Sequence, residues 1–128
     1  MLADAIRQAQ RMHRAVMEAT YDGECRIYEM HPVKDIKTKV TKQKEVMVID
    51  NLPCHLSYSS LPIVAKRDNA AVAVQTNKLF TAPERDIKPG TRIEVTQQGR
   101  TESYRRSGKP AVYASHQEIL LELWEGYV

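Results

Sequence analysis

The chain begins with apolar residues spaced three and four positions apart. Between Leu2 and Ala19 one side of a helical projection carries leucine, isoleucine, alanine, methionine and valine, and the other carries glutamine and arginine. This spacing predicts one amphipathic helix. Thr20 to Gly23 should end it, because glycine readily takes the positive φ of a chain leaving a helix. We expect its narrow apolar stripe to pack on its own domain, with packing against a neighbouring subunit as the alternative.

From Glu24 onward, apolar and polar residues alternate with a period of two, which is typical of half-buried strands. Asn51–Pro53 should form a bulge or corner, because proline removes a ladder donor. Turns are expected at 89–90, 98–99 and 107–110. The strand segments are 24–30, 45–50 and 54–59 on either side of that bulge or corner, 70–76 together with 78–81, 93–95, 102–104, 111–115 and 118–125. The sequence therefore predicts a mainly β protein, a small antiparallel β-barrel or sandwich of six to seven strands with one N-terminal helix.

Two segments break this alternation. Residues 34–44 carry five lysines against one acid, Asp35, and form a Lys-rich arm. The simplest interpretation is a solvated hairpin whose lysines keep one face wet. Residues Ser59 to Asn69 have no clean period and contain Pro62, so we expect a long exposed loop, of a length that compact domains seldom keep without a function.

Length and composition indicate one domain covering 1–128, with the helix in 1–20 and the barrel in 21–128. Only 6% of the 128 residues are aromatic, so aliphatic side chains must fill most of the core. The net charge of +3 is too small to indicate a protein that depends on many phosphate contacts. No signal peptide or membrane-spanning run is evident, so we expect a cytoplasmic protein that does not bind membranes.

No catalytic or metal centre is predicted. Cys25 and Cys54 have no metal-ligand spacing, and we expect both to be reduced, small apolar fillers on strands. The four histidines are not spaced with a second ligand in a metal pattern. A nucleophile pair of Cys54 with His31 or His116 is the remaining enzymatic alternative, although no oxyanion hole or orienting acid is evident. We therefore expect a protein that is not an enzyme and has no cofactor.

The remaining candidates are basic side chains. Lys66 and Arg67 on the 59–69 segment are the candidates for contact with DNA. Further basic residues that could contact other subunits or another protein are Lys37, Lys39, Lys42, Arg7, Arg11 and Arg14. A monomer would bind DNA weakly, because few phosphates can be engaged at once. A ring of copies directed into one channel would sum these fields.

Four segments, in this order and spacing, resemble the head-closure, or head–tail connector, proteins of long-tailed bacteriophages and of PBSX-like defective prophages of Gram-positive bacteria. The likeness runs through nearly the whole chain. The segments are Tyr21-Asp22-Gly23-Glu24-Cys25, the run from Asn51 to Ser59, the run from Ile87 to Thr96, and the run from Ser107 to Glu118.

The resemblance implies a β-barrel protein that assembles as a ring, twelve-fold in the virion, at the neck below the portal and its adaptor. Its partners there would be the portal or adaptor protein, a tail-completion or tail protein, further copies of itself, and packaged double-stranded DNA bound without sequence preference. In that family a long loop near the middle of the chain gates the DNA channel. By position, that loop is Ser59–Asn69 here. His55 stands where a basic residue such as arginine is expected.

A nucleic-acid-binding module of the oligonucleotide-binding type is the alternative function. The same strand count and the Lys-rich arm favour it. Such barrels stack bases on exposed aromatic rings, and this chain offers Tyr28, Tyr58, Tyr104 and Tyr113 for that purpose.

Overall fold

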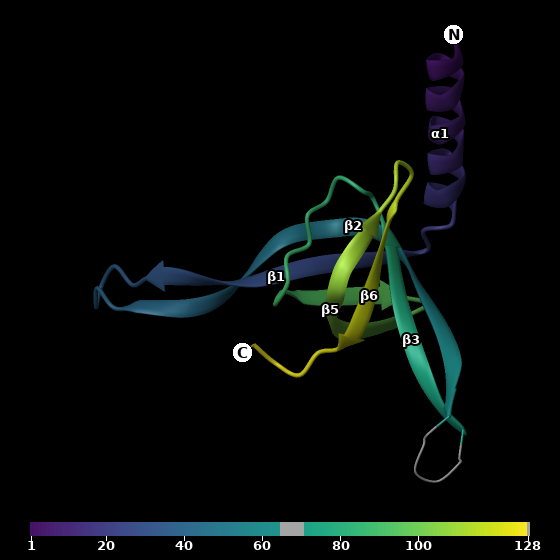
Figure 1. Ribbon diagram of the computed structural model, residues 1–128. Coiled ribbons are helices and arrows are strands. Elements are labelled where there is room, and N and C mark those ends of the chain that lie inside the picture. The colour runs from purple at the N-terminus through teal and green to yellow at the C-terminus, as the bar shows by residue number, and fades with distance from the viewer. Residues whose placement is uncertain (65–70, 128) are drawn as a thin grey trace.

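The computed structural model describes the backbone of residues 1–64 and 71–127 and the side chains of 1–59 and 76–127. It contains one helix and a closed antiparallel barrel with the strand order β1-β2-β3-β6-β5-β4 (Figure 1). The predicted fold class is confirmed, as a barrel rather than a sandwich. The elements are α1 (Leu2–Ala19), β1 (Gly23–Lys34), β2 (Thr41–Val64), β3 (Ala71–Thr81), β4 (Arg92–Gln97), β5 (Arg100–Val112) and β6 (Gln117–Leu123).

Alternate residues of each strand fill the barrel interior, as the period of two requires. Ile93 and Val95 of β4 are buried, and so are Ile119 and Leu121 of β6. Ile87, in the connection between β3 and β4, is also buried and closes part of the interior. Aliphatic side chains therefore provide most of the core, as the low aromatic content indicates.

Both cysteines belong to this interior. Cys25 of β1 and Cys54 of β2 are fully buried free thiols, so the predicted role as small apolar fillers is confirmed. They come from neighbouring strands, in which Gly23 pairs with Cys54 and Cys25 pairs with Leu52. Contact with the Cys54 thiol, together with burial, raises the pKa of the Cys25 thiol.

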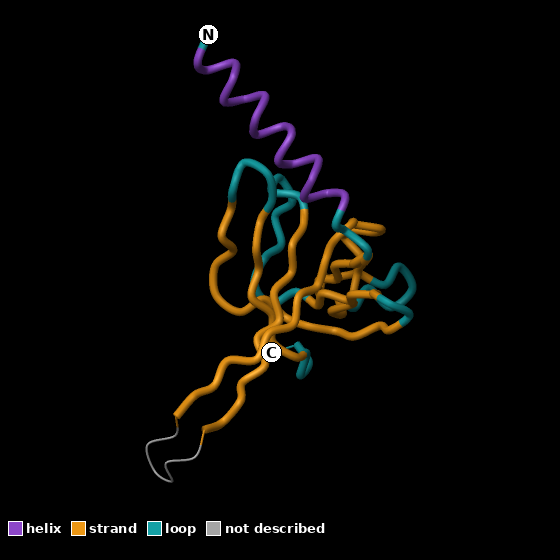
Figure 2. Tube along the Cα trace, turned by 90° about the vertical axis from the view of Figure 1, so that its right-hand side faces the viewer, coloured by secondary structure: helices purple, strands orange, loops and turns teal. Residues whose placement is uncertain are grey.

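The expectation that helix α1 packs on its own core is wrong. None of its residues is buried, and the helix stands away from the barrel (Figures 1 and 2). It is linked to the rest of the chain by the Arg14 guanidinium, which pairs with Glu84 beyond β3 and with Glu18 in the helix, and by the edge-on approach of the His13 and His116 rings at 6.2 Å. Met12 and Val16, on its apolar stripe, are each 64% exposed. The narrow stripe predicted the helix correctly but not what covers it.

Gly23 also differs from its expected role. The helix ends with Thr20 in right-handed backbone geometry, and Gly23 is the first residue of β1 without a positive φ. A Cβ at Gly23 would lie 2.9 Å from Gln97 Oε1 and 3.2 Å from the carbonyl oxygen of Thr96. Glycine is required here for close approach of strands rather than for a left-handed turn.

The turn predictions are partly confirmed. Gln98 and Gly99 have φ of 53° and 73° and connect Gln97 to its partner Arg100, which makes a two-residue hairpin of the primed type. The predicted turn at Ser107–Pro110 is wrong, because these residues lie inside β5. The pairing of β5 with β6 changes register between Ser107 and Ala111, and Gly108 has a φ of 73°. Glycine and proline here produce a bulge and not a strand end.

Strand β2 is much longer than the sequence indicated. It runs through the expected bulge, where Asn51 has a φ of 48° and the pairing with β1 shifts register between Cys25 and Ile27. Both its ends extend beyond the barrel. One end forms a β1–β2 ribbon (residues 29–46), and the other forms a β2–β3 ribbon that leaves in a different direction (Figure 1).

The predicted loop Ser59–Asn69 is therefore wrong over its first half. Residues 59–64 continue β2 and pair with β3, from Ser59 with Thr76 to Val64 with Ala71. Pro62 fits a two-stranded ribbon, in which each strand has one free edge. The part of the predicted loop from 65 onward, with Lys66 and Arg67, lies outside the described residues.

Candidate assembly surface

The β1–β2 ribbon is the most prominent projection built from described side chains. Strand β4 pairs with β1 only from Glu24 to Tyr28, so beyond Tyr28 the ribbon has two strands and two free edges. A free-edged ribbon exposes backbone donors and acceptors that other chains can use. Lysines on the ribbon and Pro32 oppose indiscriminate pairing.

The Lys-rich arm is the outer end of this ribbon, and its predicted hairpin is confirmed. Asp35 shapes the turn, because its carboxylate accepts the backbone N–H of Lys37 at 2.9 Å. Lys39 has a φ of 58°, and Lys42 pairs with Val33 across the ribbon. Within the described part of the chain, no lysine of the arm forms an ion pair. These ammonium groups are therefore available to a partner. The ion pairs that the structure contains are elsewhere.

Apolar side chains lie between these lysines. Ile36, at the turn, is 93% exposed, and Val33 and Val40 are also exposed. Together with the surrounding lysines they line a hollow of about 440 Å³ at the tip. Apolar residues surrounded by charged ones are typical of the centre and rim of a protein interface.

The base of the β1–β2 ribbon is fixed by Arg92. Its guanidinium donates to both carboxylate oxygens of Glu45, at 2.6 and 3.0 Å, and to Ser103 Oγ at 3.0 Å. It also lies 4.1 Å above the ring of Tyr28. Because Arg92 is on β4 and Glu45 is on the ribbon, this network holds the ribbon at a fixed angle to the barrel.

The charges at this base perturb each other's titration. The Arg92 guanidinium lowers the pKa of Glu45, and the two Glu45 hydrogen bonds raise the pKa of Arg92. Tyr127 donates its hydroxyl proton to Glu45 at 2.6 Å, and burial followed by this bond raises the Tyr127 pKa to about 12. The C-terminal residues thus reinforce the same network.

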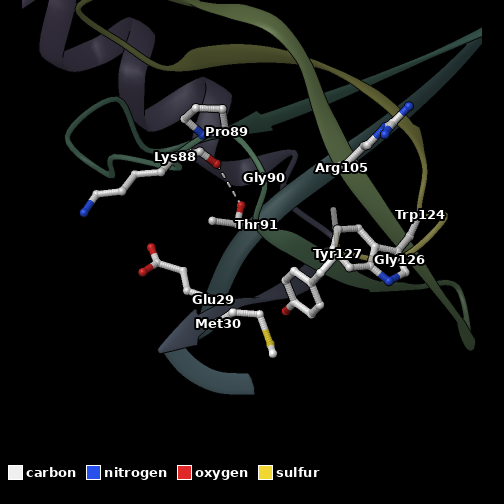
Figure 3. A pocket seen from close by; sticks show the side chains of 10 residues that line it. All are labelled: Glu29, Met30, Lys88, Pro89, Gly90, Thr91, Arg105, Trp124, Gly126 and Tyr127. Atoms are coloured by element: carbon white, nitrogen blue, oxygen red, sulfur yellow. Dashed lines mark hydrogen bonds between the residues drawn. The ribbon is translucent and has the colours of Figure 1, made fainter. Parts of the chain in front are cut away.

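A hollow of about 370 Å³ lies beside this base (Figure 3). Glu29 and Met30 of the ribbon form one wall, and Trp124 and Tyr127 form another with their rings edge to face at 4.6 Å. The far wall is the predicted turn at Gly90. Gly90 has a φ of 80°, which confirms the positive φ expected for a type II turn. The hollow is open and mixed in character, and it places the ribbon base next to the C-terminal residues.

The three helix arginines have different surroundings. Arg14 is held by its two glutamates, which raise its pKa. Arg7 lies 3.9 Å from Asp4 in a loose exposed pair, and Arg11 is exposed. Arg14 therefore holds the helix on the barrel, whereas Arg7 and Arg11 face solvent.

The alternative nucleophile pair, Cys54 with His31 or His116, is not assembled among the described residues. His31 is hydrogen-bonded to Glu29 on the ribbon, and Cys54 is enclosed in the core. His116 does meet an acid that sequence reasoning missed, since its Nε2 lies 2.9 Å from Glu118 Oε2 and its Nδ1 lies 2.7 Å from Ser115 Oγ. His116 directly precedes β6 and Glu118 is its second residue, and this i and i+2 spacing could have indicated the pair.

His116 and Ser115 are packed against neighbouring side chains. His116 is 6% exposed and stacks on Tyr113 at 5.0 Å, and Ser115 is also buried. Hydrogen bonding to His116, and then to Lys78, lowers the pKa of Glu118.

In the described residues, no three of the His, Cys, Asp and Glu side chains lie close enough to hold a metal ion. No helix in the described part is both long and apolar enough to cross a membrane.

These features define a small barrel from which a helix and two ribbons project. No protein-family model matches the chain, and no curated protein matches it. Among solved structures, the chain is similar to the phage-like element PBSX protein xkdH from Bacillus subtilis, with 14% identity and a TM-score of 0.47. The alignment covers 78% of this chain and 91% of that chain. This degree of similarity carries no conclusion about family or function.

Proposed function

We propose that this protein is a structural, non-enzymatic subunit of a ring that joins the head of a phage or prophage particle to its tail. The observation that carries the proposal is the 18-residue helix α1, which has an apolar stripe but no buried residue. A lone helix of this kind gains little stability in water, so its stripe needs a partner. The order of the four motifs that resemble head-closure proteins supports the same role.

In this role each projecting element makes a different contact. The helix and the Lys-rich arm contact neighbouring copies and the portal or adaptor protein, and the barrel provides rigidity. The β2–β3 ribbon reaches toward the DNA channel, and the residues connecting its strands include Lys66 and Arg67. Contact with the packaged duplex would be through phosphates and independent of sequence. The protein would then occupy the virion neck after assembly in the bacterial cytoplasm.

Electron microscopy of particles made without this protein tests the proposal. We expect DNA-filled heads that lose their genome and fail to join tails. Complementation with the intact chain should restore both, whereas a chain with residues 65–70 replaced by a short Gly-Ser turn should fold but fail to retain DNA, because loop length changes stability little. Particles that keep their genome and bind tails without the protein would contradict the proposed role.

A nucleic-acid-binding module is the second candidate, and one observation favours it. Tyr58 is 55% exposed beside Arg100, Gln97 and Gln98, around a hollow of about 550 Å³. An aromatic face next to a guanidinium suits a stacked base. Of the other tyrosines, Tyr104 is buried, the ring of Tyr28 is covered by Arg92, and Tyr113, although 51% exposed, stacks on His116. This function requires micromolar binding of single-stranded DNA by the purified chain at low salt, which a titration measures directly.

A further inference from the structure

The tip of the Lys-rich arm and the base of helix α1 have complementary surfaces on opposite sides of the barrel. We propose that the arm tip of one copy docks into the hollow at the base of α1 in a second copy, with Ile36 as the apolar anchor. This inference rests on the proposed ring and identifies the contact that would build it.

The tip has the chemistry of an inserted element. Ile36 is 93% exposed at the turn, and Val33 and Val40 extend the apolar surface behind it. Lys34, Lys37, Lys42 and Lys44 surround these three residues in the same hollow. A nucleic-acid backbone has no apolar surface to bury Ile36, so a protein partner fits this tip better than a polyanion alone.

The receiving hollow has about 310 Å³ and is lined by Glu18, Tyr21, Pro53 and Ala82. Its walls are largely apolar. The Tyr21 hydroxyl is buried and has no hydrogen-bond partner among the described residues. A buried hydroxyl without a partner is unfavourable, and an incoming backbone group or ammonium would satisfy it.

Charge also favours this pairing. The last turn of α1 has no basic residue, so the negative end of the helix dipole is not compensated within the helix. Glu18 and Glu84 add two carboxylates at this base, and one guanidinium, that of Arg14, is shared between them. Lysines at the rim of the arm would complete this balance and orient the docking.

The contact must be between copies. The β1–β2 ribbon extends from the barrel away from α1, so the tip cannot reach the base of its own helix (Figure 1). Because tip and base are different surfaces, the interface is heterologous, and its repetition gives a closed ring or an open filament rather than a two-fold dimer.

Disulfide trapping tests this contact on the full chain. The double variant I36C/A82C, oxidised at high protein concentration, should give a ladder of cross-linked species. A mixture of the two single variants should stop at a dimer, with peptide mass spectrometry locating the link between positions 36 and 82. The wild-type chain carries the same buried native thiols and should give no ladder. P53C, at the neighbouring lining residue on β2, replaces A82C if A82C does not fold.

A matched pair of variants separates the anchor from charge. The double variant T38C/A82C traps the same contact while keeping Ile36. Adding I36D to this double variant should slow its cross-linking at least tenfold, because the apolar anchor is lost. The control K39D in the same background changes charge at the turn and should slow the reaction less. Equal slowing by I36D and K39D, linkage of position 36 only to itself, or no linkage at millimolar protein would overturn the docking. If the docking is overturned but particles without the protein still lose their genome, the proposed function remains supported.

Discussion

Replacing Arg92 with alanine should destabilise the protein by about 2 kcal/mol. Hydrogen bonds to charged groups contribute roughly 1.5–3 kcal/mol each, and the Arg92 guanidinium makes two with Glu45, one with Glu94 and one with Ser103. Its side chain is 18% exposed and that of Glu45 is 34% exposed, so water recovers part of this loss and the total stays below the sum. Loss of the Tyr28 contact adds a smaller amount.

Thermal unfolding followed by circular dichroism measures this effect. A loss of about 2 kcal/mol in a domain of this size should lower the Tm by roughly 6–10 °C. Arg105→Ala is the matched control, because Arg105 forms its ion pair with Glu122 at the surface, and it should change the Tm much less. Equal Tm values for Arg92→Ala and Arg105→Ala at pH 7 would refute the view that Arg92 fixes the ribbon base.

The pH dependence provides a second check on Arg92. Its guanidinium lowers the pKa of Glu45 below the ordinary value of 4.5. A carboxyl with a depressed pKa in the folded state stabilises the protein fully above its unfolded pKa, and this stabilisation is lost as pH falls through the folded pKa. The Tm difference between wild type and Arg92→Ala should therefore be constant from pH 7 to about 5 and shrink below about pH 4.5. A difference that grows with acid would contradict the pairing.

The remaining predictions concern the core and the helix. Gly23→Ala should lower the Tm, because an added Cβ would lie 2.9 Å from Gln97 Oε1 and 3.2 Å from the carbonyl oxygen of Thr96; an unchanged Tm would contradict the close approach. Val16→Asp should leave the Tm of the isolated chain nearly unchanged but reduce its incorporation into particles, measured by quantitative mass spectrometry, and a large fall in Tm would show that the stripe packs on its own barrel. The thiols of Cys25 and Cys54 should react with a thiol reagent only after denaturation, because both are fully buried, and rapid labelling of the native chain would place them at the surface.

Local patterns were sufficient to predict the strands but not where each one ends. The β4–β5 hairpin was predictable, because Gln98-Gly99 lies between two alternating segments and a two-residue turn fixes their register. Proline and glycine at 107–110 gave the same signal, yet β5 continues through them as a bulge. Turn residues mark irregular backbone, and only the partner strand decides between a bulge and a turn.

The candidate assembly surface was also predictable from the sequence only in part. The lysine content of the arm was visible in the sequence, and the hairpin followed from it. The pairing of Arg92 with Glu45 joins residues 47 positions apart, so it depends on the barrel closing β4 against β1, which local patterns do not specify. The exposed position of α1 was also not predictable, because an apolar stripe looks the same whether its partner is the same chain or another.

Cryo-electron microscopy of the head–tail junction in assembled particles tests the central claim most directly. We predict a ring of density at the neck whose repeating unit fits the barrel, with helix α1 covered by a neighbouring chain. A neck map with no density that fits this chain, in particles that join tails normally, would contradict the account.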